Sequence, residues 1–128
     1  MPDGLDEREV SEQLAGELLR LHRESYGRGA GKARVYVHDD LLVCLLDDLE
    51  LLPNEEFLIE NGHGDGVVDV RGRYQQAIEA TFCAAVERAT GRRVVSFASI
   101  TKLSPTYGVE IFRLGESHPS SLEELECD

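Results

Sequence analysis

Two strand-like runs separated by only two residues constrain the fold of this chain more than any other feature. Arg34–His38 alternates, with its valines on one face, as is typical of a strand that is covered on one side. Leu41–Leu46 is apolar on both faces and predicts a central strand, or a strand whose second face meets something else. Because Asp tolerates turn conformations, Asp39 and Asp40 predict the tight turn of a β-hairpin.

Three other segments predict helices. Apolar residues lie on one helical stripe across 6–25 and again across 67–89, so both segments predict amphipathic helices. Pro53 and Asn61 mark the start and the end of a shorter helix between them. The glycine-rich residues 62–66 predict a flexible turn before the longest helix.

A second hairpin completes the predicted fold. Residues 93–102 and 109–114 are rich in β-branched and aromatic side chains and flank a turn around Pro105. The order α-β-β-α-α-β-β predicts an α+β fold, in which two hairpins form a four-stranded antiparallel sheet with helices packed on one face. Residues 1–115 then form a single domain, and the acidic residues 116–128 form a flexible C-terminal tail.

Such a sheet leaves its other face open. The strand at 41–46 is apolar on both faces, so it also places apolar side chains on that open face. We therefore expect a homodimer that associates across the open face or across an edge of the sheet.

Composition and charge exclude several classes of function. The net charge is −12 and the pI is near 4.7, so the chain repels a phosphate backbone and we expect no nucleic-acid partner. No uncharged apolar run approaches the roughly 20 residues of a membrane-spanning helix, so we expect no direct membrane insertion. The N-terminus lacks the pattern of a signal peptide, and an odd number of cysteines cannot all pair internally. Both features indicate a cytoplasmic protein.

A glycine-rich, basic segment next to the first hairpin is the best candidate for ligand contact. It fails the phosphate-loop pattern, because Tyr26 stands at the first glycine position and Ala33 at the hydroxyl position. A plain connector is one interpretation, and a loop that contacts a small anion or a partner is the other. The candidate loop comprises Tyr26, Arg28, Lys32, Arg34, His38, Asp39 and Asp40.

His38, Asp39 and Asp40 together suggest acid–base chemistry, but neighbours in a strand point to opposite faces and converge only at a turn. We favour the turn role for the aspartates. The histidines are scattered singly, and Cys44 and Cys83 fall on apolar faces where thiols behave as small hydrophobes. We therefore expect no catalytic residue, no metal and no cofactor.

Four short motifs in a fixed order resemble a known family. They are Leu21-His22-Arg-Glu-Ser-Tyr-Gly-Arg-Gly29, Arg34-Val-Tyr-Val-His-Asp-Asp40, Glu87-Arg-Ala-Thr-Gly-Arg-Arg-Val94 and Val109-Glu-Ile-Phe112. Residues 14–114 are similar through these motifs to the MpsC family, named after a component of a sodium-translocating, membrane-potential-generating system. The family often has proline where Ala30 stands and an acidic turn where this chain has residues 103–107. The resemblance carries no catalytic residue over to this chain.

The resemblance implies a non-enzymatic, cytoplasmic accessory or regulatory module linked to a membrane cation or bicarbonate transport system. Such a module acts through protein–protein or small-anion binding, and its partners are a membrane transport subunit, a regulatory protein or a second copy. Two alternatives stay open: a small acid–base enzyme that uses His38 with Asp39 or Asp40, and a nucleotide or phosphate sensor that uses Arg28, Lys32 and Arg34.

Overall fold

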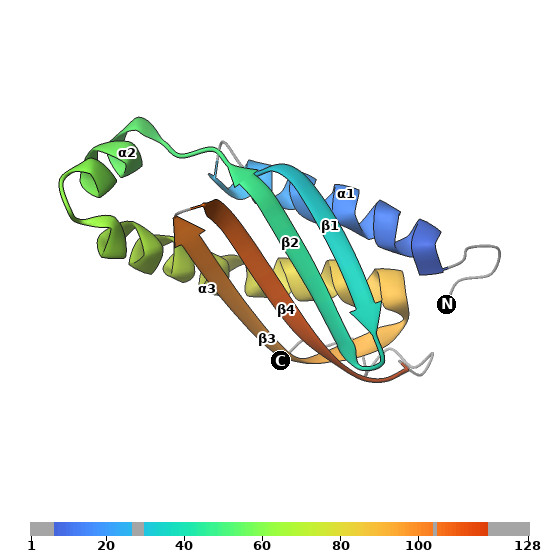
Figure 1. The fold of residues 1–128 in the computed structure, drawn as a ribbon. Coiled ribbons are helices and arrows are strands. Elements are labelled where there is room, and N and C mark those ends of the chain that lie inside the picture. Colours follow the sequence, from blue (N-terminus) through green and yellow to red (C-terminus); the bar gives the residue numbers. More distant parts are fainter. Residues whose placement is uncertain (1–6, 27–29, 104, 118–128) are drawn as a thin grey trace.

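The computed structural model describes residues 7–26, 30–103 and 105–117, and these ranges contain three helices and four strands. In chain order the elements are α1 (Glu7–Tyr26), β1 (Ala30–His38), β2 (Leu41–Leu49), α2 (Pro53–Glu60), α3 (Gly64–Thr90), β3 (Arg92–Leu103) and β4 (Thr106–Ser117). This order confirms the α-β-β-α-α-β-β arrangement predicted from the sequence (Figure 1).

The strands form one antiparallel sheet in the order β1-β2-β4-β3 (Figure 1). The two hairpins meet through β2 and β4, where Leu42 lies opposite Phe112 and Cys44 opposite Glu110. The strands β2 and β4 are therefore central, and β1 and β3 are the two edges of the sheet. The predicted four-stranded sheet is confirmed.

All four strands run further than the sequence indicated, and the extensions of β1 and β4 change two of the expectations. The strand β1 begins at Ala30, so Gly31 and Lys32 belong to the sheet and not to the glycine-rich loop. Glycine allows this pairing, because a Cβ at position 31 would lie only 3.2 Å from the Cβ of Asp48. The strand β4 continues to Ser117, which takes the domain two residues into the segment expected to be a tail. Residues 118–128 of that tail lie outside the described part of the chain.

The helix α3 begins at Gly64, so the flexible turn expected at 62–66 was wrong for its last three residues. Gly64 packs closely on β3, because a Cβ there would lie 3.1 Å from Cδ1 of Leu103. The end of the helix is where the sequence placed it: Gly91 has a φ of 69° and its N–H donates to the carbonyl of Glu87 at 2.9 Å.

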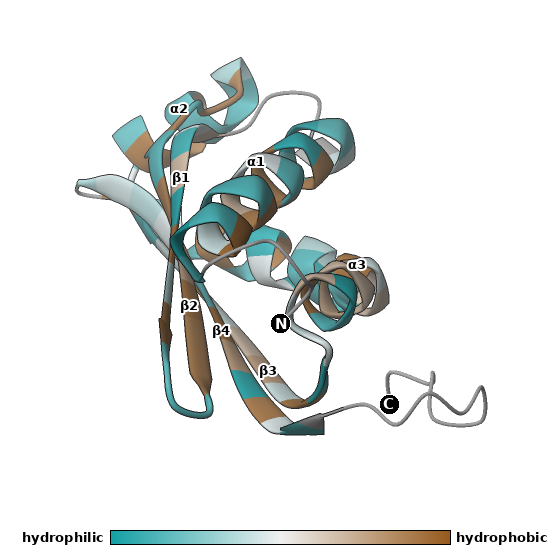
Figure 2. Cartoon of the chain, turned by 90° about the vertical axis from the view of Figure 1, so that its right-hand side faces the viewer, coloured by the Kyte–Doolittle hydropathy of each residue, from teal (hydrophilic) through white to brown (hydrophobic). Residues whose placement is uncertain are grey.

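The core lies between the sheet and two helices. Figure 2 shows α1 and α3 on the same side of the sheet, where α1 packs on β1 and α3 packs on β3. The buried cluster includes Leu14, Leu18, Leu42, Cys44, Leu46, Phe82, Cys83, Val86, Phe112 and Leu114. The packing of helices on one face is thus confirmed, as is the burial of the two cysteines.

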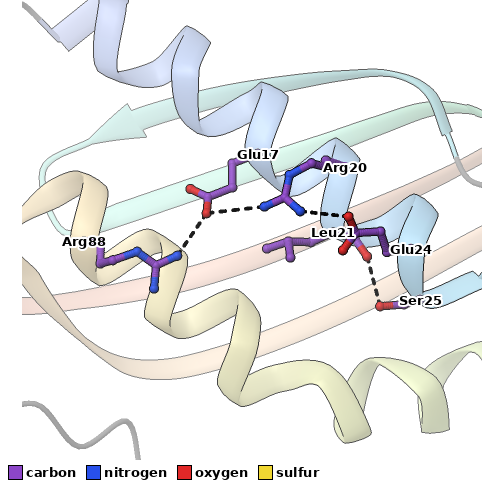
Figure 3. Close-up of polar contacts among 6 residues, drawn as sticks. All are labelled: Glu17, Arg20, Leu21, Glu24, Ser25 and Arg88. Carbon is purple, nitrogen blue, oxygen red and sulfur yellow. Dashed lines mark hydrogen bonds and ion pairs between the residues drawn. The ribbon is translucent and has the colours of Figure 1, made fainter.

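Ion pairs link the helices to each other. The carboxylate of Glu17 on α1 lies between two guanidinium groups, 2.9 Å from Arg88 on α3 and 3.9 Å from Arg20 on its own helix (Figure 3). In the second link, Arg71 of α3 makes two bonds of 2.8 and 2.9 Å to the carboxylate of Glu55 on α2. The same carboxylate accepts the N–H of Leu52, so it also fixes the start of α2.

His22 and Glu110 are titratable side chains that are almost fully buried between the sheet and the helices. Burial, with a smaller contribution from Arg71, lowers the pKa of His22 to about 4. Burial raises the pKa of Glu110 to about 7. Neither carboxyl oxygen of Glu110 has good hydrogen-bond geometry to a described residue, although Ser99 directly opposite is near enough to lower the pKa slightly. Glu110 is therefore protonated in the folded protein at mildly acidic pH.

Adjacent residues on β4 test which face of the sheet is covered. Phe112 is fully buried under the helices, whereas Ile111 points to the opposite side and is only half-buried. We expect Phe112→Ala to lower the free energy of unfolding by about 3–5 kcal/mol, and Ile111→Ala by about 1 kcal/mol. Urea denaturation of both variants measures these costs. Equal losses would contradict the assignment of the faces.

The raised pKa of Glu110 predicts a pH-dependent stability. A carboxyl group whose pKa rises on folding, here from an ordinary 4.5 to about 7, stabilises the fold below pH 4.5 and loses that contribution as the pH rises through 7. Relative to wild type, Glu110→Gln should therefore gain roughly 3 kcal/mol of unfolding free energy between pH 4.5 and pH 8. Denaturant titrations across that range measure the difference. A difference that stays constant with pH would show that Glu110 is ionised in the fold.

Candidate functional site

Four rows of side chains cross the side of the sheet that faces away from the helices. Strand alternation and the register of the four strands place them there. From one end of the sheet to the other, the rows are Lys32, Asp47, Tyr107 and Lys102; Arg34, Leu45, Val109 and Ile100; Tyr36, Val43, Ile111 and Ala98; and His38, Leu41, Arg113 and Ser96. We call this surface the open face.

The two middle rows of the open face are apolar apart from Arg34 at the β1 edge. Tyr36 and Ile100 have exposed fractions of 53% and 49%, which is high for side chains of this size. Val43 and Leu45 between them are half-buried, because their neighbours in the rows shield their sides. Exposure of a contiguous apolar surface to water is unfavourable for a monomer. Such a surface is therefore typical of an interaction site.

The outer rows of the open face are mainly cationic. These two rows contain Lys32, Lys102 and Arg113 and a single carboxylate, Asp47, and Arg34 borders them on β1. The whole chain, in contrast, carries a net charge of −12. Arg34 lies 2.8 Å from that carboxylate, which raises the pKa of the guanidinium above its ordinary value. The open face therefore combines an apolar centre with a basic rim.

The residues of the predicted candidate loop divide between the two ends of β1. Lys32 and Arg34 lie near its start and His38 at its end, all on the open face. Six residues of extended strand separate Lys32 from His38 by roughly 20 Å. The structure thus aligns these side chains along one border of the open face and does not gather them in one pocket. Arg28 and the side chain of Tyr26 lie outside the described residues.

The acidic tip of the first hairpin is a turn, as the sequence predicted. Asp39 has a φ of 52°, and His38 pairs directly with Leu41, so only two residues connect the strands. Asp40 lies 2.7 Å from Arg113, whose hydrogen bond lowers the pKa of the carboxyl. Arg92 donates to the carbonyl of Asp39 at 2.7 Å. These contacts tie the tip to β4 and β3.

A cavity of about 440 Å³ next to this tip tests the acid–base alternative. His38 and Asp39 line it together with Ser11 and Arg92. The Nε2 atom of His38 is 3.4 Å from Oδ2 of Asp39, but these side chains are 90% and 85% exposed. An acid–base pair in bulk water lacks the positioning and the exclusion of solvent that make such a pair effective. The arrangement therefore offers a binding hollow more readily than a catalytic site.

The described residues contain no group of three or more His, Cys, Asp or Glu side chains placed to hold a metal ion. None of the helices in the described ranges combines the length and the apolar character needed to cross a bilayer.

The apolar contribution of the second hairpin to the open face was missed from the sequence. Val109 and Ile111 alternate with Glu110 and Phe112, so either pair could have faced the core. Only the pairing of β4 with β2 decides between them, because Phe112 lies opposite the buried Leu42. The doubly apolar pattern of β2 was the one available signal that a second apolar face existed.

The comparison with protein families gives a single result. Residues 6–116 match the sequence model of the family described as "Na+-translocating membrane potential-generating system (MpsC)". No curated protein and no solved structure matches the chain significantly. The family match spans the whole described fold, from α1 almost to the end of β4. The chain therefore belongs to the MpsC family.

Proposed function

We propose that this protein is a non-enzymatic, cytoplasmic accessory or regulatory module of a membrane cation or bicarbonate transport system. It acts as a homodimer and binds a partner protein on its open face. The family gives the link to a sodium-translocating, membrane-potential-generating system. The observation that carries the binding role is the apolar centre of the open face within a basic rim.

The apolar centre supplies the free energy of such binding. Covering a side chain such as Tyr36 or Ile100, which are about half exposed, removes apolar surface from water at about 25 cal/mol per Å². Large exposed apolar side chains at the centre of a surface are also the usual hot spots of protein–protein contacts. The two middle rows therefore favour a partner that presents apolar side chains.

The basic rim specifies the charge of the partner. Lys32, Lys102 and Arg113 surround the apolar rows, whereas the rest of the chain is strongly acidic. An acidic partner segment is attracted to this face and repelled by the other surfaces, which orients the encounter. We infer a partner segment with apolar side chains flanked by carboxylates.

A pair of valine variants tests this function. Val43→Glu places a carboxylate in the middle of the open face, and Val70→Glu makes the same change at a 50% exposed position of α3. We expect partner proteins to be cross-linked in cells to wild type and to the Val70→Glu variant. We expect the same partners to be lost from the Val43→Glu variant, because a buried charge opposes docking. Quantitative mass spectrometry measures the loss, and circular dichroism checks the fold of each variant.

Complementation of a deletion strain separates binding from catalysis. The double variant His38→Ala with Asp39→Ala should restore the phenotype, since the proposed function needs no acid–base pair, whereas Val43→Glu should not. The reverse result would support the enzyme alternative. Equal capture by all three proteins in the cross-linking experiment, or no membrane or regulatory protein above background, would contradict the proposed docking surface.

A further inference from the structure

The outer edge of β3 is unusually open to pairing. β3 has 12 residues, and no charged side chain occurs between Val94 and Thr101. Natural edge strands are usually protected by charges, by proline or by short length. The opposite edge strand, β1, carries Lys32 and Arg34 within its length. Among the described residues, only β4 pairs with β3.

The direction of the backbone groups follows from one hydrogen bond. The N–H of Leu114 donates to the carbonyl of Asp40 at 2.7 Å, so the backbone of Leu114 faces β2. Alternation then turns Ile111 and Val109 toward β3, where they lie opposite Ala98 and Ile100. The N–H and C=O groups of the intervening residues point away from the sheet. These residues are Phe97, Ser99 and Thr101.

A groove runs beside this edge and leaves room for another strand. Its volume is about 700 Å³, and it lies between residues 97–101 of β3 and residues 68–79 of α3. The helix therefore does not cover the edge along its central residues. A row of outward N–H and C=O groups in such a groove is complementary to an extended backbone.

We propose that β3 pairs antiparallel with β3 of a second copy, centred on Ser99, so that two sheets join into one eight-stranded sheet. This inference names the interface of the homodimer and in that respect rests on the proposed function. A two-fold axis perpendicular to the sheet places both pairs of helices on the same side. The two open faces then form one continuous surface.

The sequence of β3 is self-complementary in this register. Ala98 lies opposite Ile100 of the second copy, which pairs two apolar residues on the open face. Ser96 lies opposite Lys102 of the second copy, so no like charges meet. An axis between Phe97 and Ala98 would instead place Arg93 opposite Lys102. It would also pair outward-facing with inward-facing backbone groups. The register centred on Ser99 avoids both problems.

The wall of the groove carries charges of both signs, namely Asp69, Arg73 and Glu79 of α3. Because α3 and β3 are antiparallel and connected at Gly91, Glu79 and Phe97 lie at similar distances from that connection, roughly 18 Å and roughly 20 Å. Arg73 lies further along, at the level of Ile100 by the same rises per residue. The two-fold axis at Ser99 therefore brings Arg73, which lies 3.3 Å from Asp69 of its own helix, toward Glu79 of the second copy, and the reverse.

Proline substitution at the two edges tests the interface. Thr101→Pro removes an outward N–H from β3, and Ala33→Pro removes the corresponding outward N–H from β1, without loss of a ladder bond in either case. By light scattering after gel filtration we expect wild type and Ala33→Pro at about 28 kDa, twice the 14.2 kDa chain. We expect Thr101→Pro at the mass of one chain. Circular dichroism confirms that each variant is folded.

Charge at Ser96 tests the register without disturbing the backbone. Ser96→Lys places an ammonium group opposite Lys102 of the second copy at two symmetry-related positions of the dimer, where like charges repel. Ser96→Glu places a carboxylate at the same two positions, where opposite charges attract. We expect the dimer Kd to rise about tenfold in the first variant and to fall in the second. Analytical ultracentrifugation measures both constants.

Three outcomes would overturn the β3 interface: a monomeric wild type, a dimer insensitive to Thr101→Pro and to charge at Ser96, or a dimer that only Val43→Glu dissociates. The proposed function fails independently, since partner capture that is insensitive to Val43→Glu would contradict it even if the dimer forms through β3.

Discussion

The pairing of β2 with β4 is the constraint on which the rest of this structure depends. Leu42 opposite Phe112 fixes the register of the two hairpins. That register places their largest apolar side chains together under α1 and α3. It also places Val43 opposite Ile111 on the other side, where no element among the described residues covers them. A shift by one residue would exchange the two faces, so core and open face are determined together.

The two faces of the sheet differ in where their titratable groups lie. The covered face holds Glu110 near the middle of β4, with its pKa raised to about 7 by burial, and His22 of α1 has its pKa lowered to about 4. The open face holds its charges at the rim, where Arg34 and Arg113 are paired with aspartates in solvent. Surface pairs of this kind contribute little to stability. Together with Lys32 and Lys102, these rim charges therefore matter for recognition more than for folding.

Much of the fold could be predicted from local patterns. The turn at Asp39, the stop of α3 at Gly91 and the two amphipathic helices all depend on residues close in sequence. The start of α3 at Gly64 and the inclusion of Lys32 in β1 could not, because both depend on close contacts with distant residues. Local signals thus set the elements, and tertiary packing moved their ends.

The site was only partly predictable for the same reason. The basic residues of β1 were identified, but a loop at 26–32 and a tip at 38–40 were read as one site although they lie at opposite ends of a strand. The apolar half of the open face that β3 and β4 provide was missed. The burial of Glu110 explains why this apolar half was missed. A glutamate between Val109 and Ile111 normally indicates the solvent-exposed side of a strand.

Methyl NMR in the presence of a soluble gadolinium chelate tests the central claim most directly, because it compares adjacent residues of one strand. The chelate broadens methyl groups that solvent reaches. We predict strong broadening for Val43 and Leu45, which face the open side, and protection of Leu42 and Leu46, which face the helices. Equal protection of all four residues would contradict an uncovered face.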